Sequence, residues 1–275
     1  FVFVTQIGAL LLTVFNADKM AVMFVGAMCA VGTLNANAWG FPMLHAQIAV
    51  FFLAAVWLTL NQVDNQAPDY PLVRVKYALL LLLLPALAAT FALQFKYFLN
   101  LRADVITSCC GSLFSEQGPA LASEASGMEA RPAILLFYGA LGAAVFANGL
   151  HAGLRLRWSG VVGALASAAA FVAGIVGILS FVSLYVYEHP HHHCPFCLLK
   201  PEYSYQGYLL YVPLFVSTAA GLGAGILQPF AGVGSLKVLV PRASGRLAGA
   251  AALGFALFAA VATIMVLKSN LILLA

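Results

Sequence analysis

The stretch YALLLLLLPALAATFALQFKYFLN, Tyr77–Asn100, decides the class of fold. It is long enough to cross the hydrocarbon layer of a membrane, which takes a helix of about 20 apolar residues. Its one charged residue, Lys96, lies near its end. A helix bonds every backbone N–H and C=O within such a segment, where no water is present to do so. The stretch therefore predicts a transmembrane helix, with a kink at Pro85.

The same pattern recurs along the chain and predicts an all-α, polytopic integral membrane helical bundle of about eight transmembrane helices. A cleaved signal peptide would explain at most one of these apolar runs. We expect a single transmembrane domain over residues 1–275. Residues of small volume at four-residue spacing, Gly163 with Ser167 and Gly221 with Gly225, predict close helix–helix contacts. The expected spans are Phe1–Phe15, Met20–Leu34, Met43–Leu60, Tyr77–Asn100, Pro132–Leu150, Val161–Tyr187, Gly207–Leu227 and Leu247–Leu274.

The composition of the whole chain supports this class. Hydrophobic residues make up 63% of it and charged residues 8%, whereas an average soluble domain is about 25% charged. So few charges exclude a soluble enzyme and a disordered chain. The 13 basic and 9 acidic residues are also too sparse to follow a phosphate backbone, so nucleic acid is not expected as a partner.

The lysines and arginines predict the orientation, because cytoplasmic loops carry an excess of them. If the spans alternate, the loops on one side hold eight basic residues. They are Lys19, Arg74, Lys76, Arg155, Arg157, Lys237, Arg242 and Arg246. The opposite side holds fewer basic residues and most of the acidic ones, in loops over about 101–131 and 188–206. We therefore expect a multi-pass protein of a bacterial-type inner (plasma) membrane, with these two loops extracytoplasmic.

Four of the five cysteines fall in the two loops that the orientation places outside. Cys109 and Cys110 are adjacent in the first loop, and Cys194-Pro195-Phe196-Cys197 follows three histidines in the second. Neighbouring cysteines close a strained ring if they are joined to each other, so a partner elsewhere or a shared metal is favoured for the first pair. Cys29, in a predicted span, is interpreted as an apolar packing residue.

Three interpretations of these four cysteines stay open. Structural disulfides between the loops suit an extracytoplasmic compartment. A C-x-x-C motif also suits thiol–disulfide exchange, with Cys194 as the more exposed nucleophile, Cys197 as the resolving thiol, and Cys109 with Cys110 passing oxidising equivalents onward. The third interpretation is a metal site, because thiolate and imidazole ligands suit copper or zinc. Its candidate ligands are His191, His192, His193, Cys194 and Cys197.

An outer-loop cysteine pair together with a C-x-x-C motif resembles the quinone-linked, disulfide-generating membrane proteins of the vitamin K epoxide reductase and DsbB types. The resemblance covers these two motifs alone and not the number of spans, which is about half as large in those families. It implies that the outer-loop pair exchanges with the C-x-x-C motif at a helix end beside a quinone.

Other polar and aromatic residues give weaker signals. His45 is a candidate cofactor-binding residue for haem or copper, because it should lie near the same outer face as the loop histidines. His151 is expected to be hydrogen-bonded in a helix interface, and this is also the favoured alternative for His45. Tyrosines around the second loop predict an interfacial aromatic belt. They are Tyr185, Tyr187, Tyr203, Tyr205, Tyr208 and Tyr211.

These observations predict an inner-membrane protein that handles thiols or a soft metal, copper or zinc, at its extracytoplasmic face. Quinone and haem are the less favoured cofactors, and the expected partners are the lipid bilayer and a protein at that face. The alternative is a non-catalytic anchor or scaffold subunit of a respiratory or transport complex. In that alternative the cysteines form structural disulfides.

Overall fold

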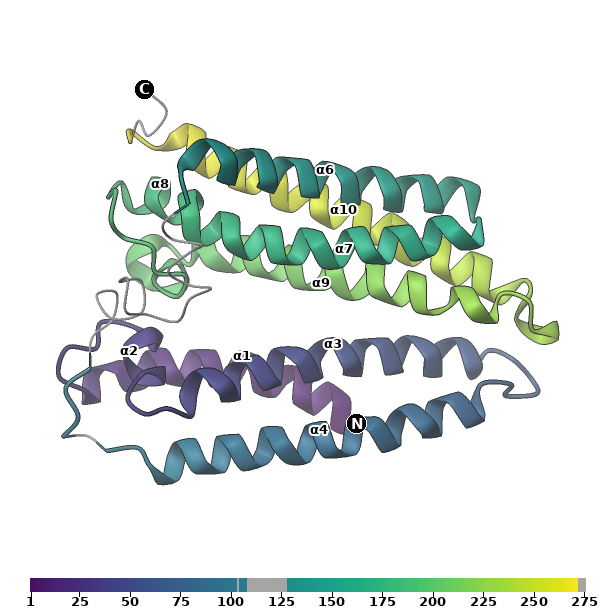
Figure 1. Ribbon diagram of the computed structural model, residues 1–275, viewed down its shortest axis with the longest axis horizontal. Helices are drawn as coiled ribbons and strands as arrows, with labels where there is room; N and C mark the ends of the chain where they lie inside the picture. The colour runs from purple at the N-terminus through teal and green to yellow at the C-terminus, as the bar shows by residue number, and fades with distance from the viewer. Residues whose placement is uncertain (103, 108–127, 272–275) are drawn as a thin grey trace. The chain divides into compact units, whose positions relative to one another are not determined.

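The computed structural model describes residues 1–102, 104–107 and 128–271 (Figure 1). Within these ranges all regular secondary structure is helical. Among them, six helices are long and apolar enough to cross a membrane. They are α3 (Gly40–Asp64), α4 (Val73–Leu99), α6 (Ala130–Leu154), the continuous helix Arg157–Tyr187, α9 (Gln206–Ile226, continued by a turn to Phe230) and α10 (Leu239–Lys268). The prediction of a helical membrane protein is thus confirmed, whereas the number of about eight spans is not.

The prediction of a span over Met20–Leu34 is wrong. Helix α1 (Val2–Met20) comes first, and the predicted span holds only the 3₁₀ turn Ala21–Met23 and the short helix α2 (Ala30–Leu34). Gly26 lies between these two at φ +86°, and a Cβ there would lie 2.1 Å from the carbonyl oxygen of Thr107. The segment is apolar enough for a span, but its backbone turns at this glycine instead of continuing as a helix.

Without the span Met20–Leu34, the side of the membrane predicted for Lys19 changes. Without a crossing between α1 and α3, Lys19 falls on the same side as the start of α3, not with the other basic loops. The prediction for the loops after α3 is unaffected, because the six predicted spans from Met43–Leu60 onward each correspond to one candidate span.

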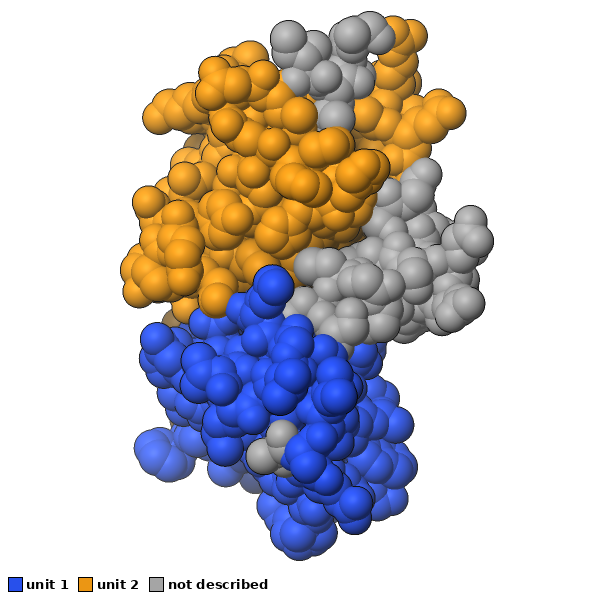
Figure 2. All heavy atoms as spheres, turned by 90° about the vertical axis from the view of Figure 1, so that its left-hand side faces the viewer, with its two compact units in different colours: residues 1–58, 75–123 blue, residues 59–74, 124–275 orange. Residues whose placement is uncertain are grey.

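The chain divides into two compact units (Figure 2). Unit 1 holds residues 1–58 and 75–123, and unit 2 holds residues 59–74 and 124–275. In unit 1, α4 buries one residue in every seven, Lys76, Leu83, Thr90 and Tyr97. The Tyr97 hydroxyl donates to the Thr33 carbonyl at 3.1 Å, which joins α4 to α2. Most of the surface of α4 is exposed and apolar, as suits contact with lipid.

Unit 2 is a bundle of four long helices, α6, α7, α9 and α10, which run side by side (Figure 1). The continuous span Arg157–Tyr187 consists of α7 (Arg157–Gly177), a π-helical segment (Ile178–Val182) and α8 (Ser183–Tyr187). The core of the bundle is aromatic, with Phe137, Phe181, Phe255 and Phe258 fully buried. Phe137 packs edge-to-face on Phe181, with the ring centroids 5.2 Å apart.

The predicted close contacts through small residues are confirmed between α7 and α9. A Cβ on Gly221 would lie 2.0 Å from Ser167 Oγ, and one on Gly225 would lie 2.3 Å from the Ala164 Cβ. Such glycines let two helix backbones approach, which lipid-embedded helices need because no hydrophobic effect drives them together.

His151 is hydrogen-bonded in a helix interface, as predicted. Its Nδ1 lies 2.9 Å from Ser159 Oγ, and its Nε2 lies 3.2 Å from both Ser244 Oγ and Gln228 Nε2. The amide nitrogen of Gln228 can only donate, so His151 Nε2 accepts and a neutral ring carries its proton on Nδ1. The residue therefore ties α6 to α7, α10 and the turn after α9.

Candidate cysteine site

The second cysteine loop, residues 188–205, joins α8 to α9 at one end of unit 2. It leaves α8 through Glu188, which takes the left-handed conformation at φ +52°. The Glu188 carboxylate accepts bonds from the backbone N–H and side-chain amide of Asn270, each at 2.9 Å. The start of the loop is thus attached to the chain that follows α10.

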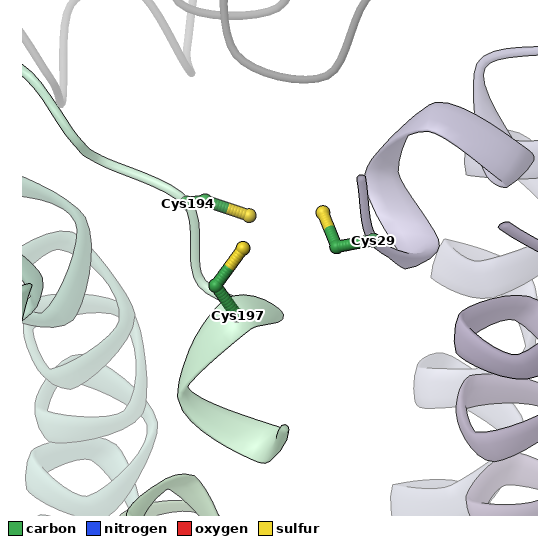
Figure 3. Close-up of side chains that lie close together, drawn as sticks. All are labelled: Cys29, Cys194 and Cys197. Carbon is green, nitrogen blue, oxygen red and sulfur yellow. The ribbon is translucent and has the colours of Figure 1, made fainter. Parts of the chain in front are cut away.

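Cys194 and Cys197 lie close together in this loop. Their sulfur atoms are within 4.8 Å of each other, and no disulfide joins them. Cys194 is 0% exposed and Cys197 is 6% exposed. Figure 3 shows Cys194 on the extended part of the loop and Cys197 at the start of the 3₁₀ turn Cys197–Leu199, with the two side chains directed toward each other. The expectation that Cys194 is the more exposed thiol is wrong, because both are buried.

Two tyrosines hold the backbone of the motif. The Tyr187 hydroxyl donates to the carbonyl of Cys194 at 2.5 Å, and the Tyr211 hydroxyl donates to the carbonyl of Pro195 at 2.9 Å. Tyr187 ends α8 and Tyr211 lies in the second turn of α9, so both helices that flank the loop fix its conformation. The aromatic belt predicted for these tyrosines stays a prediction, and the hydrogen bonds give two of them a further role in the loop.

Further aromatic rings cover Tyr187. The His192 ring stacks on it with the centroids 4.0 Å apart, and Tyr203 meets it at 4.6 Å in an edge-to-face contact. Burial raises the pKa of the Tyr203 phenol, and the negative charges of ionised Cys197 and Glu202 raise it further. The phenol thus stays neutral beside the thiols over a wider range of pH than an exposed tyrosine.

His193 attaches the loop to the π-helical segment. Its Nδ1 lies 2.8 Å from the carbonyl oxygen of Leu179, and since a carbonyl only accepts, Nδ1 carries a proton and donates. The lone pair of a neutral ring is then on Nε2, the arrangement that metal-binding histidines adopt. A π-helical turn displaces the regular i→i−4 bonding, and such turns occur often at functional sites.

The three predicted metal-binding histidines have separate surroundings. His192 stacks on Tyr187, His193 donates to Leu179, and His191 is exposed with its ring 6.1 Å from that of His189. Within the described residues, none of them joins the two cysteines in a group whose ligand atoms all lie within 4.8 Å of one another. Their part in a metal site stays a prediction.

The other predicted site residues lie elsewhere or outside the described residues. Cys109 and Cys110 fall within residues 108–127, which the structure does not describe. His45 is exposed on α3, with its ring 6.4 Å from that of Phe41. It therefore does not lie buried in a helix interface. Cys29, in unit 1, directly precedes α2 and is buried.

Sequence reasoning named Tyr187 and Tyr211 but did not predict their hydrogen bonds to the loop, and it missed the Leu179 carbonyl. The signal for Tyr187 and Tyr211 is that each lies at the end of a predicted helix next to the C-x-x-C motif. The Leu179 carbonyl has no sequence signal, because an apolar π-helical turn reads as ordinary apolar helix. Comparisons with protein-family models, with curated proteins and with solved structures found no match to this chain.

Proposed function

We propose that this membrane protein binds a soft metal ion through the thiolates of Cys194 and Cys197 at its extracytoplasmic face. Copper(I) is favoured over zinc. One observation carries the proposal: the two buried thiols lie within 4.8 Å of each other, in a loop whose carbonyls two tyrosines hold. Thiolate ligands select copper(I) and zinc over harder ions.

The sulfur–sulfur distance suits a single ion. With metal–sulfur bonds of about 2.3 Å, two sulfurs lie about 3.8 Å apart around a tetrahedral ion and about 4.6 Å apart across a linear one. Both values fit within the 4.8 Å limit. Copper(I) is satisfied by two sulfurs, whereas zinc in proteins takes four ligands. The pair alone therefore favours copper(I), and zinc would require further ligands such as His193.

The distribution of charge in unit 2 supports an extracytoplasmic location of the cysteine loop. The cysteine loop lies where the span Arg157–Tyr187 ends and α9 begins, and five basic residues lie at or near the opposite ends of the long helices of unit 2. They are Arg155, Arg157, Lys237, Arg242 and Arg246. By the positive-inside rule that opposite end is cytoplasmic.

Thiol–disulfide exchange at the same pair is the second candidate, favoured by the C-x-x-C spacing. The thiolate of one cysteine would attack a partner's disulfide, and the other would resolve the mixed disulfide. The partner would leave as a dithiol, and a Cys194–Cys197 disulfide would remain. The burial of both sulfurs places this candidate second, because a partner's disulfide must reach one of them.

The test is to titrate the purified protein with copper(I) and with zinc and to measure metal bound per chain, alongside the variants Cys194→Ser and Cys197→Ser. We expect one copper per chain for the natural protein and a loss of at least 100-fold in affinity for either variant. Phe196→Leu is the matched control, because it changes the same loop and keeps both thiols.

Equal copper binding by the serine variants would overturn the metal proposal. If the natural protein instead bound no copper and alkylation showed a Cys194–Cys197 disulfide that a dithiol substrate reduces, exchange would replace it. If neither copper nor thiol reagents reached the pair, the alternative of a non-catalytic anchor or scaffold subunit would be favoured.

A further inference from the structure

Five basic side chains are exposed at the end of unit 2 opposite the cysteine loop. Two come from the junction of α6 and α7, one lies just before α10, and two lie in the first two turns of α10. They are Arg155, Arg157, Lys237, Arg242 and Arg246. None of the five makes an ion pair with any residue that the structure describes. We call them the basic end.

Three of these arginines lie close to Gly245 in space or along α10. Arg155 ends α6 in the left-handed conformation at φ +54°, and its backbone N–H donates to the His151 carbonyl. Its Nε lies 3.2 Å from the position that a Cβ on Gly245 would take. On α10, Arg242 lies three residues before Gly245 and four before Arg246, spacings that place Arg242 on the same helix face as each of them.

Acidic residues are almost absent from the rest of unit 2. Between residues 128 and 271 the only acidic residues are Glu129, which directly precedes α6, and Glu188 and Glu202 in the cysteine loop, all three at the other end. The segment 59–74 adds Asp64, which is buried and accepts the backbone N–H of Leu72, and the exposed Asp69. Gathering three positive charges with no carboxylate paired to them costs repulsion, which a bound anion removes.

The basic end lies at the level of the lipid headgroups. Arg155 directly follows the span Ala130–Leu154, and Trp158, 58% exposed, begins the next one. Exposed tryptophan at a helix end is typical of the membrane interface. Arg157 reaches across to the loop after α9, where its Nη2 lies 2.7 Å from the position of a Cβ on Gly232. Glycine at this position leaves room for the guanidinium group.

We infer that the basic end binds the phosphate headgroup of an anionic phospholipid, held by Arg155, Arg242 and Arg246. A diacyl lipid fits better than a free anion, because its chains lie along the exposed apolar helices while its phosphate reaches the arginines. Each basic residue near a membrane surface strengthens binding of an anionic lipid about five-fold. This inference is independent of the proposed metal site.

The test follows the melting temperature of the full chain in neutral detergent during titration with short-chain phosphatidylglycerol, short-chain phosphatidylcholine and inorganic phosphate. We expect phosphatidylglycerol alone to raise the melting temperature. Each of Arg155→Gln, Arg242→Gln and Arg246→Gln should weaken its apparent affinity about five-fold. Arg131→Gln, which removes the same charge at the opposite end of α6, is the matched control and should leave the affinity unchanged.

Equal shifts from phosphatidylcholine would overturn the inference, and so would an Arg131→Gln variant that weakens binding as much as the other three. An equal effect of inorganic phosphate would overturn the choice of a lipid and assign a free anion. The single variants keep the test valid because each replaces one exposed side chain.

Discussion

The hydrogen bond between His193 and Leu179 is one of the contacts that attach the cysteine loop to the membrane-spanning part of unit 2. The imidazole donates through Nδ1 to a carbonyl of the π-helical segment. Asparagine presents an N–H at nearly the position of Nδ1, whereas glutamine presents it near the position of Nε2. The two amides therefore separate this hydrogen bond from a general need for a polar side chain.

We predict that His193→Ala destabilises the protein by about 1 kcal/mol, the usual worth of one hydrogen bond. For a chain of this size that corresponds to a fall in melting temperature of about 2–4 °C. His193→Asn should restore most of the loss, and His193→Gln should not. Thermal unfolding in detergent measures all three, and equal melting temperatures for the two amide variants would contradict the role of Nδ1.

At the scale of the helix, the glycines of α9 determine how closely it approaches α7. Gly221 faces Ser167, whose hydroxyl already donates to the Gly163 carbonyl and lies 2.9 Å from the Asn148 amide nitrogen. A methyl group at Gly221 would displace this hydroxyl and break both bonds. By contrast, Gly149 on α6 is exposed and has no atom within 4 Å of its Cβ position.

We predict that Gly221→Ala destabilises unit 2 by about 1–3 kcal/mol, the usual cost of overpacking. Gly149→Ala should be neutral or stabilising by up to about 1 kcal/mol, because alanine is the better helix former. Both melting temperatures are measured in the same detergent. A Gly221→Ala protein as stable as the Gly149→Ala protein would show that α7 and α9 do not pack through this contact.

The helices and loops also show which features could be predicted from the sequence alone. Long apolar runs such as Tyr77–Asn100 predict spans correctly, because length and hydropathy are properties of the residues themselves. Met20–Leu34 is also apolar, but its backbone turns at Gly26, where Thr107 approaches from about 80 residues away. The C-x-x-C pair was likewise visible in the sequence. The hydrogen bonds from Tyr187 and Tyr211 to its carbonyls were not, because the sequence shows which residues flank the loop but not which atoms they contact.

At the scale of the whole molecule, unit 2 has two chemically different ends. The cysteine loop holds its thiols, both glutamates between residues 130 and 275 and most of the chain's histidines, whereas the basic end holds only cationic charge. The proposed metal site and the proposed lipid site both depend on which end faces the cytoplasm. One experiment on orientation therefore bears on both.

We predict that the cysteine loop faces outward and the basic end inward. Ser204 and Gly234 are exposed positions at the two ends, and a side chain at Gly234 meets no atom within 4 Å. In a chain whose five native cysteines are replaced by serine, a membrane-impermeant maleimide should label Ser204→Cys in intact cells. Gly234→Cys should be labelled only after the membrane is permeabilised. The reverse pattern would place the thiols in the reducing cytoplasm, where a lasting disulfide is disfavoured, and would leave the arginines facing the leaflet that is poorer in anionic lipid.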